Sequence, residues 1–193
     1  MNDCTPLQER LLFLQKFLSA PLSTGSIVPS SRHLTKAMLK PINWENSRHI
    51  AELGAGTGVF TREIRRRRDP RCQVYIFERD EALRERLQVE IPDFSFHPDA
   101  RDIHLLPREE DSAPLLDGII SGLPFANFPT SLRDQILDNV KAALKPDGKF
   151  IAFQYSLRLK SRLEKRFEKV STSLVTLNVP PAFVHVCEGP RGN

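Results

Sequence analysis

The chain has 193 residues, 40% of them hydrophobic, and a mean hydropathy of −0.34, which is the composition of one folded globular domain and excludes a disordered chain. No apolar run approaches the roughly 20 residues that a membrane-spanning helix requires, and we expect no secretory signal peptide. The net charge of +4 is uneven, because basic residues concentrate at 65–71 and 160–169. Such clusters suit an anionic membrane surface, nucleic acid, or simply solvated helix faces.

Cysteine usage indicates where the protein works. The three cysteines lie far apart and have no CxxC motif or histidine-rich neighbours. That pattern argues against a disulfide framework and against a metal site. We therefore expect a cytoplasmic protein without a bound metal.

The first 40 residues are predicted to be an N-terminal helix and a loop that precede the core domain. Leucines at 7, 11, 14 and 18 have the spacing of an amphipathic helix over 6–19. Such a helix packs on its own domain or lies on a membrane surface. The hydroxyl-rich segment 21–31 is either an ordinary connector or a lid, and as a lid it turns Thr24 and Ser26 toward the cofactor or substrate. It leads into a helix predicted over 31–39.

From residue 48 onward, short apolar runs alternate with helical patterns. The predicted strands of this part end near 52, 78, 97, 121 and 155. The predicted helices are 59–67, 81–89 and 130–144, followed by a basic helix over 159–170. Two last strands, at 172–177 and 182–187, precede a tail (188–193) that we expect to be disordered. The alternation predicts a single Rossmann-like, doubly wound α/β domain, whose mostly parallel seven-stranded sheet ends in an antiparallel strand pair.

The segment 52–58, which reads E-L-G-A-G-T-G, is the main functional signal of the chain. Its glycines permit positive φ and let the backbone approach a ligand, and the helix that follows presents free N–H groups. A dinucleotide-binding turn spaces its glycines as G-x-G-x-x-G around a pyrophosphate. Here the third glycine comes too early and Glu52 precedes the first. A carboxylate at that place repels a pyrophosphate but suits a cofactor that is cationic near the turn, such as S-adenosylmethionine.

The same segment resembles the first motif of class I S-adenosylmethionine-dependent methyltransferases. The resemblance implies that the glycine turn holds the methionine part of the cofactor. It also implies that an acid after the second strand binds the ribose and that an acid after the third strand contacts the adenine. The positions assigned to the cofactor in this way, with the serine that ends the fourth strand, are Glu52, Gly54, Gly56, Thr57, Glu78, Asp99, Ala100 and Ser121.

Further segments resemble the bacterial phospholipid N-methyltransferases, which are similar in turn to the ribosomal RNA adenine dimethyltransferases. These segments are 17–18, 24–31, 52–58, 121–125 and 153–155, so the resemblance spans almost the whole chain. It implies methyl transfer to an amine such as that of phosphatidylethanolamine, at the inner face of the membrane. The alternatives are an RNA adenine methyltransferase, a small-molecule methyltransferase, and a catalytically silent protein of the same fold.

The end of the fourth strand bears on the methyl acceptor. Enzymes that methylate adenine carry asparagine or aspartate where this chain has Gly122, so the missing amide counts against adenine. We expect the Leu123 carbonyl to accept a hydrogen bond from the acceptor amine. The ring of Phe125 is expected to hold a methylated ammonium by cation–π attraction. Tyr155 is a further candidate for contact with the headgroup, and for both rings the alternative is core packing.

Overall fold

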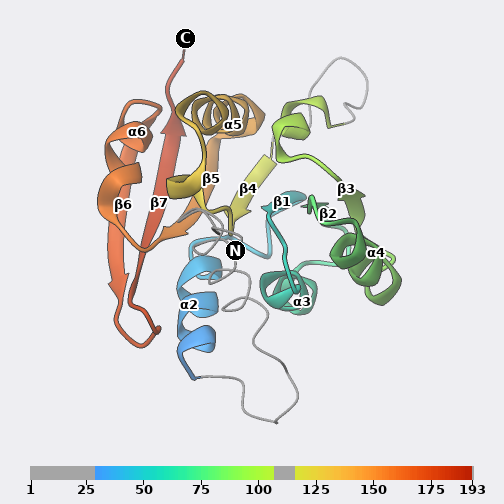
Figure 1. Ribbon diagram of the computed structural model, residues 1–193. Coiled ribbons are helices and arrows are strands. Elements are labelled where there is room, and N and C mark those ends of the chain that lie inside the picture. The colour runs from blue at the N-terminus through green and yellow to red at the C-terminus, as the bar shows by residue number, and fades with distance from the viewer. Residues whose placement is uncertain (1–28, 107–115, 193) are drawn as a thin grey trace, which may run out of the picture.

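The computed structural model describes residues 29–106 and 116–192 (Figure 1). The predicted N-terminal helix over 6–19 lies outside these residues, and so do Thr24 and Ser26. Among the residues that are described, no helix is long and apolar enough to cross a membrane.

A seven-stranded sheet with the order β3-β2-β1-β4-β5-β7-β6 forms the centre of the molecule. The strands are β1 (His49–Leu53), β2 (Gln73–Phe77), β3 (Ser95–His97), β4 (Leu116–Ser121), β5 (Leu144–Gln154), β6 (Phe167–Val175) and β7 (Ala182–Pro190). Strands β1 to β5 are paired in parallel, and β7 runs antiparallel between β5 and β6. The predicted Rossmann-like α/β architecture, with its antiparallel C-terminal pair, is confirmed.

Helices cover both faces of this sheet (Figure 1). The helices are α2 (Pro29–Leu39), α3 (Val59–Arg67), α4 (Glu81–Glu90), α5 (Thr130–Ala143) and α6 (Lys160–Glu164). Apolar residues of α2, α3 and α4 pack in one core cluster, and those of α5 and α6 pack in a second, together with the 3₁₀ helix η1 (Ala100–Leu105). The parallel strands are buried between the two clusters, which explains their nearly continuous apolar runs.

The C-terminal part of the chain differs from the prediction in two places. The basic helix predicted over 159–170 ends at Glu164, and strand β6 begins at Phe167, whose buried ring stacks on Phe150. The prediction of a disordered tail is wrong for residues 188–190, because β7 extends to Pro190 and Glu188 forms ion pairs with Lys169 and Lys149. In both places, pairing with a distant strand overrides the local pattern.

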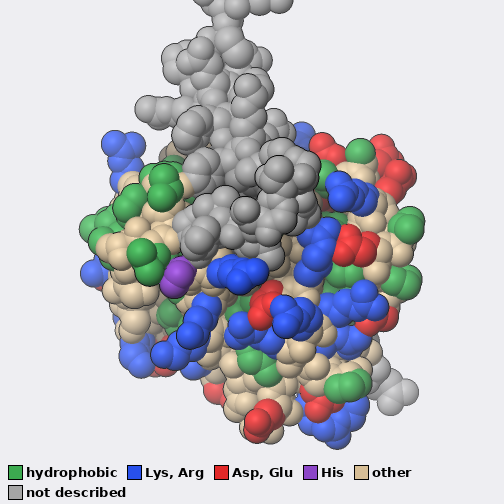
Figure 2. Space-filling model, turned by 90° about the horizontal axis from the view of Figure 1, so that it is seen from below, with side chains coloured by type: hydrophobic (Ala, Val, Ile, Leu, Met, Phe, Trp, Pro, Cys, Tyr) green, Lys and Arg blue, Asp and Glu red, His purple; other side chains and the backbone are tan. Residues whose placement is uncertain are grey.

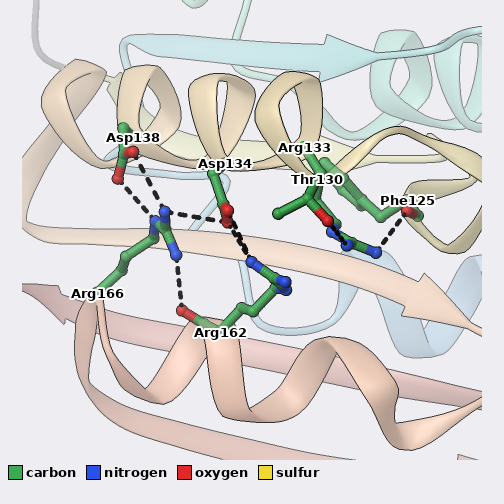
Figure 3. A network of polar contacts seen from close by, with 7 residues as sticks. All are labelled: Phe125, Thr130, Arg133, Asp134, Asp138, Arg162 and Arg166. Atoms are coloured by element: carbon green, nitrogen blue, oxygen red, sulfur yellow. Dashed lines mark hydrogen bonds and ion pairs between the residues drawn. The ribbon is translucent and has the colours of Figure 1, made fainter.

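Ion pairs within the fold occupy several residues of the two basic clusters. Figure 3 shows Arg162 and Arg166 reaching from the α6 region to acids on α5, and both carboxylate oxygens of Asp134 lie 2.7 Å from Arg162 Nη1. In the other cluster, Arg67 pairs with Glu63 on the same helix. Arg162 and Arg166 therefore tie the α6 region to α5, whereas Arg67 is engaged within its own helix.

Candidate active site

The glycine turn joins β1 to α3 at the edge of the sheet where β1, β2 and β4 end. Strands β1 and β4 are neighbours in the sheet, but the next strand after β1 lies on one side of this pair and the next strand after β4 lies on the other. The end of this pair is therefore the topological switch point of the fold. The N–H of Gly54 donates to Phe77 O at 2.7 Å, and the N–H of Gly122 donates to Leu53 O at 2.8 Å. These bonds bring the ends of three strands around one turn, which is where an open α/β sheet binds its ligand.

All three glycines of the turn have positive φ, at 76° for Gly54, 54° for Gly56 and 85° for Gly58. A Cβ atom on Gly54 would lie 2.9 Å from the Leu123 side chain, whereas one on Gly56 would meet no atom within 4 Å. The backbone at Gly56 thus borders open space, and a ligand can approach it closely.

Glu78 holds this turn in place. One carboxylate oxygen accepts a hydrogen bond from the Gly56 N–H at 2.7 Å, and the other accepts one from the Asp80 N–H at 2.8 Å. Each oxygen retains a lone pair for a ligand hydroxyl, because a carboxylate oxygen accepts two hydrogen bonds. The ribose contact of Glu78 stays a prediction, and the role of Glu78 in positioning the glycine turn was not predicted from the sequence.

Glu52 is the most perturbed acid of the site. Its side chain is fully buried, and neither carboxylate oxygen has a hydrogen-bond partner within the described residues. Burial raises the pKa of Glu52 to about 8, and the smaller effect of the nearby Thr61 hydroxyl opposes the rise. A buried acid without a partner, beside an open glycine turn, fits the cationic methionine end of S-adenosylmethionine.

The remaining cofactor positions lie at the ends of neighbouring strands. Asp99 follows β3 and accepts hydrogen bonds from the backbone and side chain of Arg101, which hold the pKa of Asp99 below its usual range. Ala100 begins the 3₁₀ helix η1 beside it. Ser121 is fully buried, and its hydroxyl accepts a 3.3 Å hydrogen bond from the Leu123 N–H. Thr57 lies in the glycine turn, where its carbonyl accepts a hydrogen bond from Arg62.

Two expectations for the acceptor side do not fit the structure. The Leu123 carbonyl already accepts hydrogen bonds from the Phe125 N–H at 2.9 Å and from Gln154 Nε2 at 3.0 Å, so both of its lone pairs are used. The ring of Phe125 is fully buried and packs edge-to-face on Phe128 and Phe150. It has no open face for an ammonium group. In the described structure, neither the Leu123 carbonyl nor the Phe125 ring is open to an acceptor.

Gln154 and Tyr155 close the site on the β5 side. Gln154 is buried and fixes the turn after β4 through the Leu123 carbonyl, a role that the sequence pattern did not reveal. In the sequence, only the position of Gln154 within the F-Q-Y segment pointed to this residue. Tyr155 is half-buried, and burial raises the pKa of its hydroxyl, an effect that the Asn178 amide beside it partly offsets. Of the two aromatic residues proposed as acceptor contacts, Tyr155 retains accessible surface and Phe125 does not.

Gly122 has a steric reason to be glycine. A Cβ atom at this position would lie 2.8 Å from the carbonyl oxygen of Gly54. Real Cβ atoms essentially never come so close to a backbone atom, so an asparagine here would force β4 and the glycine turn apart. The end of β4 therefore lacks both the adenine-recognising amide and the space for it.

The comparisons with known proteins agree with this geometry. No family model matches the chain. A protein named ornithine lipid N-methyltransferase, from Singulisphaera acidiphila, is 33% identical over 190 residues, which are 96% of this chain and 98% of the relative.

Solved structures share the fold at low sequence identity. The N-methyltransferase NodS from Bradyrhizobium japonicum, in complex with S-adenosylhomocysteine, has a TM-score of 0.69 at 14% identity over 93% of this chain and 98% of its own. The 1,6-didemethyltoxoflavin-N1-methyltransferase from Burkholderia thailandensis has a TM-score of 0.65 at 14% identity over 99% of this chain and 93% of its own. The chain thus belongs to the class I S-adenosylmethionine-dependent methyltransferases, in the family of the ornithine lipid N-methyltransferase.

Proposed function

We propose that this chain methylates the primary amine of a membrane lipid headgroup, of the phosphatidylethanolamine or ornithine lipid type, at the surface of a bilayer. The observation that carries this proposal is the 33% identity, over nearly the whole of both chains, to a protein named for methylating ornithine lipid. Phosphatidylethanolamine belongs to the same chemical class, because it also presents an amine at the polar end of a lipid.

The cofactor supplies an electrophilic methyl group on a sulfonium centre. The protein residues then have three tasks: to hold the cationic methionine end, to keep the site dry, and to position a neutral amine. Glu52 suits the first task, and the open backbone at Gly56 lets this end of the cofactor approach the turn closely. The fully buried ring of Phe125 and the buried Gln154 support the second, since they seal the base of the site.

The third task, positioning of the amine, falls to Tyr155 in this proposal. Tyr155 directly follows the last residue of β5, Gln154, and its side chain is half-buried, so it offers a partly accessible hydroxyl at this end of the sheet. An RNA adenine acceptor is disfavoured, because the position of the recognising amide is Gly122, where a side chain would meet the Gly54 carbonyl.

The test is methyl transfer from methyl-labelled S-adenosylmethionine in separate reactions with phosphatidylethanolamine vesicles, ornithine lipid vesicles and ribosomal RNA. We expect label in at least one of the two lipids and none in RNA. Glu52→Gln should abolish most of the transfer, whereas Glu85→Gln, on the exposed face of α4, should leave it unchanged. Label in RNA with none in either lipid would overturn the proposal.

A further inference from the structure

The tip of the β6–β7 hairpin carries exposed apolar side chains at the edge of the sheet that holds the active site. Strand β6 is antiparallel to β7, which is antiparallel to β5, so β6 and β5 run in the same direction. Leu174 of β6 lies level with Gln154 of β5, because both pair with Phe183. The chain that turns back after β6 is therefore on the catalytic edge, beside the last residues of β5.

At this tip, two apolar side chains face the solvent while the polar residue between them is buried. Leu177 is 61% exposed and Val179 is 67% exposed, whereas Asn178 between them is only 3% exposed. The Asn178 amide donates to Pro180 O at 2.7 Å and lies beside the Tyr155 hydroxyl. The tip is thus anchored on the proposed acceptor contact while two aliphatic side chains face outward. Isolated exposed aliphatic residues are common, but a pair held outward beside a lipid-modifying site calls for a partner.

Positive charge borders the same surface. Helix α2 packs beside β6 and β7, and its sequence contains no acidic residue. Arg32, Lys36 and the following Lys40 are exposed, and none of them forms an ion pair within the described ranges. Figure 2, which views the molecule from below, shows hydrophobic side chains gathered on the left, on the side of this hairpin, and Lys and Arg side chains across the centre. An apolar tip bordered by unpaired cations matches the boundary between acyl chains and anionic headgroups.

We propose that the β6–β7 tip docks on an anionic phospholipid bilayer, with Leu177 and Val179 in the acyl boundary and Arg32 and Lys36 at the headgroups. The inference rests on the proposed function, since it places Tyr155 at the depth of the lipid amines. Charge complementarity and the lipid substrate class favour a bilayer over a second copy of the chain, which has the same cationic surface and would repel it.

The experiment is vesicle flotation of the full-length protein with phosphatidylcholine vesicles that contain phosphatidylglycerol, and with pure phosphatidylcholine vesicles. Leu177→Ser combined with Val179→Ser should weaken binding by roughly tenfold for each side chain removed. Val89→Ser is the matched control, because Val89 is an aliphatic residue that is 84% exposed on α4, and α4 lies on the opposite side of the molecule from β6 and β7 (Figure 1). Arg32→Glu with Lys36→Glu should weaken binding to the anionic vesicles and leave binding to the neutral ones unchanged.

A second readout separates failure of this inference from failure of the proposed function. Methylation of a short-chain, monomeric aminolipid needs the active site but no bilayer, so the tip variant should keep its rate there and lose it on vesicles. If the tip variant binds and methylates vesicles as the unmodified protein does, the docking inference is wrong and the lipid function stands. If the tip supports vesicle binding while no aminolipid is methylated in any form, the proposed function is wrong. A tip variant that changes the molecular mass in solution instead identifies a second copy as the occupant and overturns the inference.

Discussion

Replacing Glu52 by glutamine should make the cofactor-free protein more stable and its cofactor binding weaker. Glutamine has nearly the same shape but no charge. The Glu52 carboxyl is fully buried without a hydrogen-bond partner in the described part of the chain, so its ionised form is costly. The substitution removes that cost, and it also removes the negative charge that the cationic end of S-adenosylmethionine requires.

The magnitude follows from the pKa of Glu52, about 8 against an ordinary 4.5. Between these values the folded protein keeps a proton that the unfolded chain has released, so the free energy of unfolding falls as the pH rises from 4.5 to about 8. Each pH unit in this window costs about 1.4 kcal/mol. The loss is therefore on the order of 3 kcal/mol near pH 7, and it is small near pH 5.

The assay is urea unfolding, without cofactor, of the unmodified protein and Glu52→Gln at about pH 5.5 and about pH 7.5. We expect the variant to be more stable by roughly 1 kcal/mol at the lower pH and by roughly 4 kcal/mol at the higher one, because each pH unit above 4.5 adds about 1.4 kcal/mol to the difference. Calorimetry should show that Glu52→Gln binds S-adenosylmethionine roughly 10- to 100-fold more weakly, the value of one hydrogen bond to a charged group. Glu85→Gln should change neither result, because Glu85 is exposed.

A variant that is less stable than the unmodified protein at the higher pH would refute the reasoning, since it would show that the carboxylate is satisfied in the folded state. Unchanged cofactor affinity would refute the assignment of Glu52 to the cofactor, whatever the stability result.

Three other substitutions test the rest of the site. Gly122→Asn should lower the free energy of unfolding by about 1–3 kcal/mol without creating RNA methylation, because the new side chain overlaps backbone; thermal unfolding and labelled RNA check both parts. Gln154→Leu leaves the Leu123 carbonyl without one donor, so kcat should fall while the Kd of the cofactor, measured by calorimetry, changes little; an unchanged kcat would contradict this. Glu78→Ala frees the Gly56 amide and should raise the Kd of the cofactor at least tenfold, because charge-assisted bonds of about 1.5–3 kcal/mol are lost; a Kd within twofold of the original would count against it.

Local features of the chain were predicted well. The turn at 52–58 and the helix over 59–67 appear where the pattern places them, because a glycine turn and an amphipathic helix depend on neighbouring residues. The helix predicted over 159–170 was wrong beyond Glu164, because the residues that follow pair with β7. Periodicity within a segment carries no information about a partner strand that lies farther along the chain.

The fold class and the class of cofactor follow from the sequence, since the glycine spacing and the acid before it restrict what the backbone can bind. What the acceptor side offers depends on the tertiary structure. Whether Phe125 faces a ligand or the core depends on how α5 packs on the sheet, and the protonation of Glu52 depends on its burial. The same holds for Gly122, where the sequence shows a missing amide and the folded chain shows that there is no space for one. Spacing along a chain specifies which atoms are near a turn, but packing decides which of them remain open to a substrate.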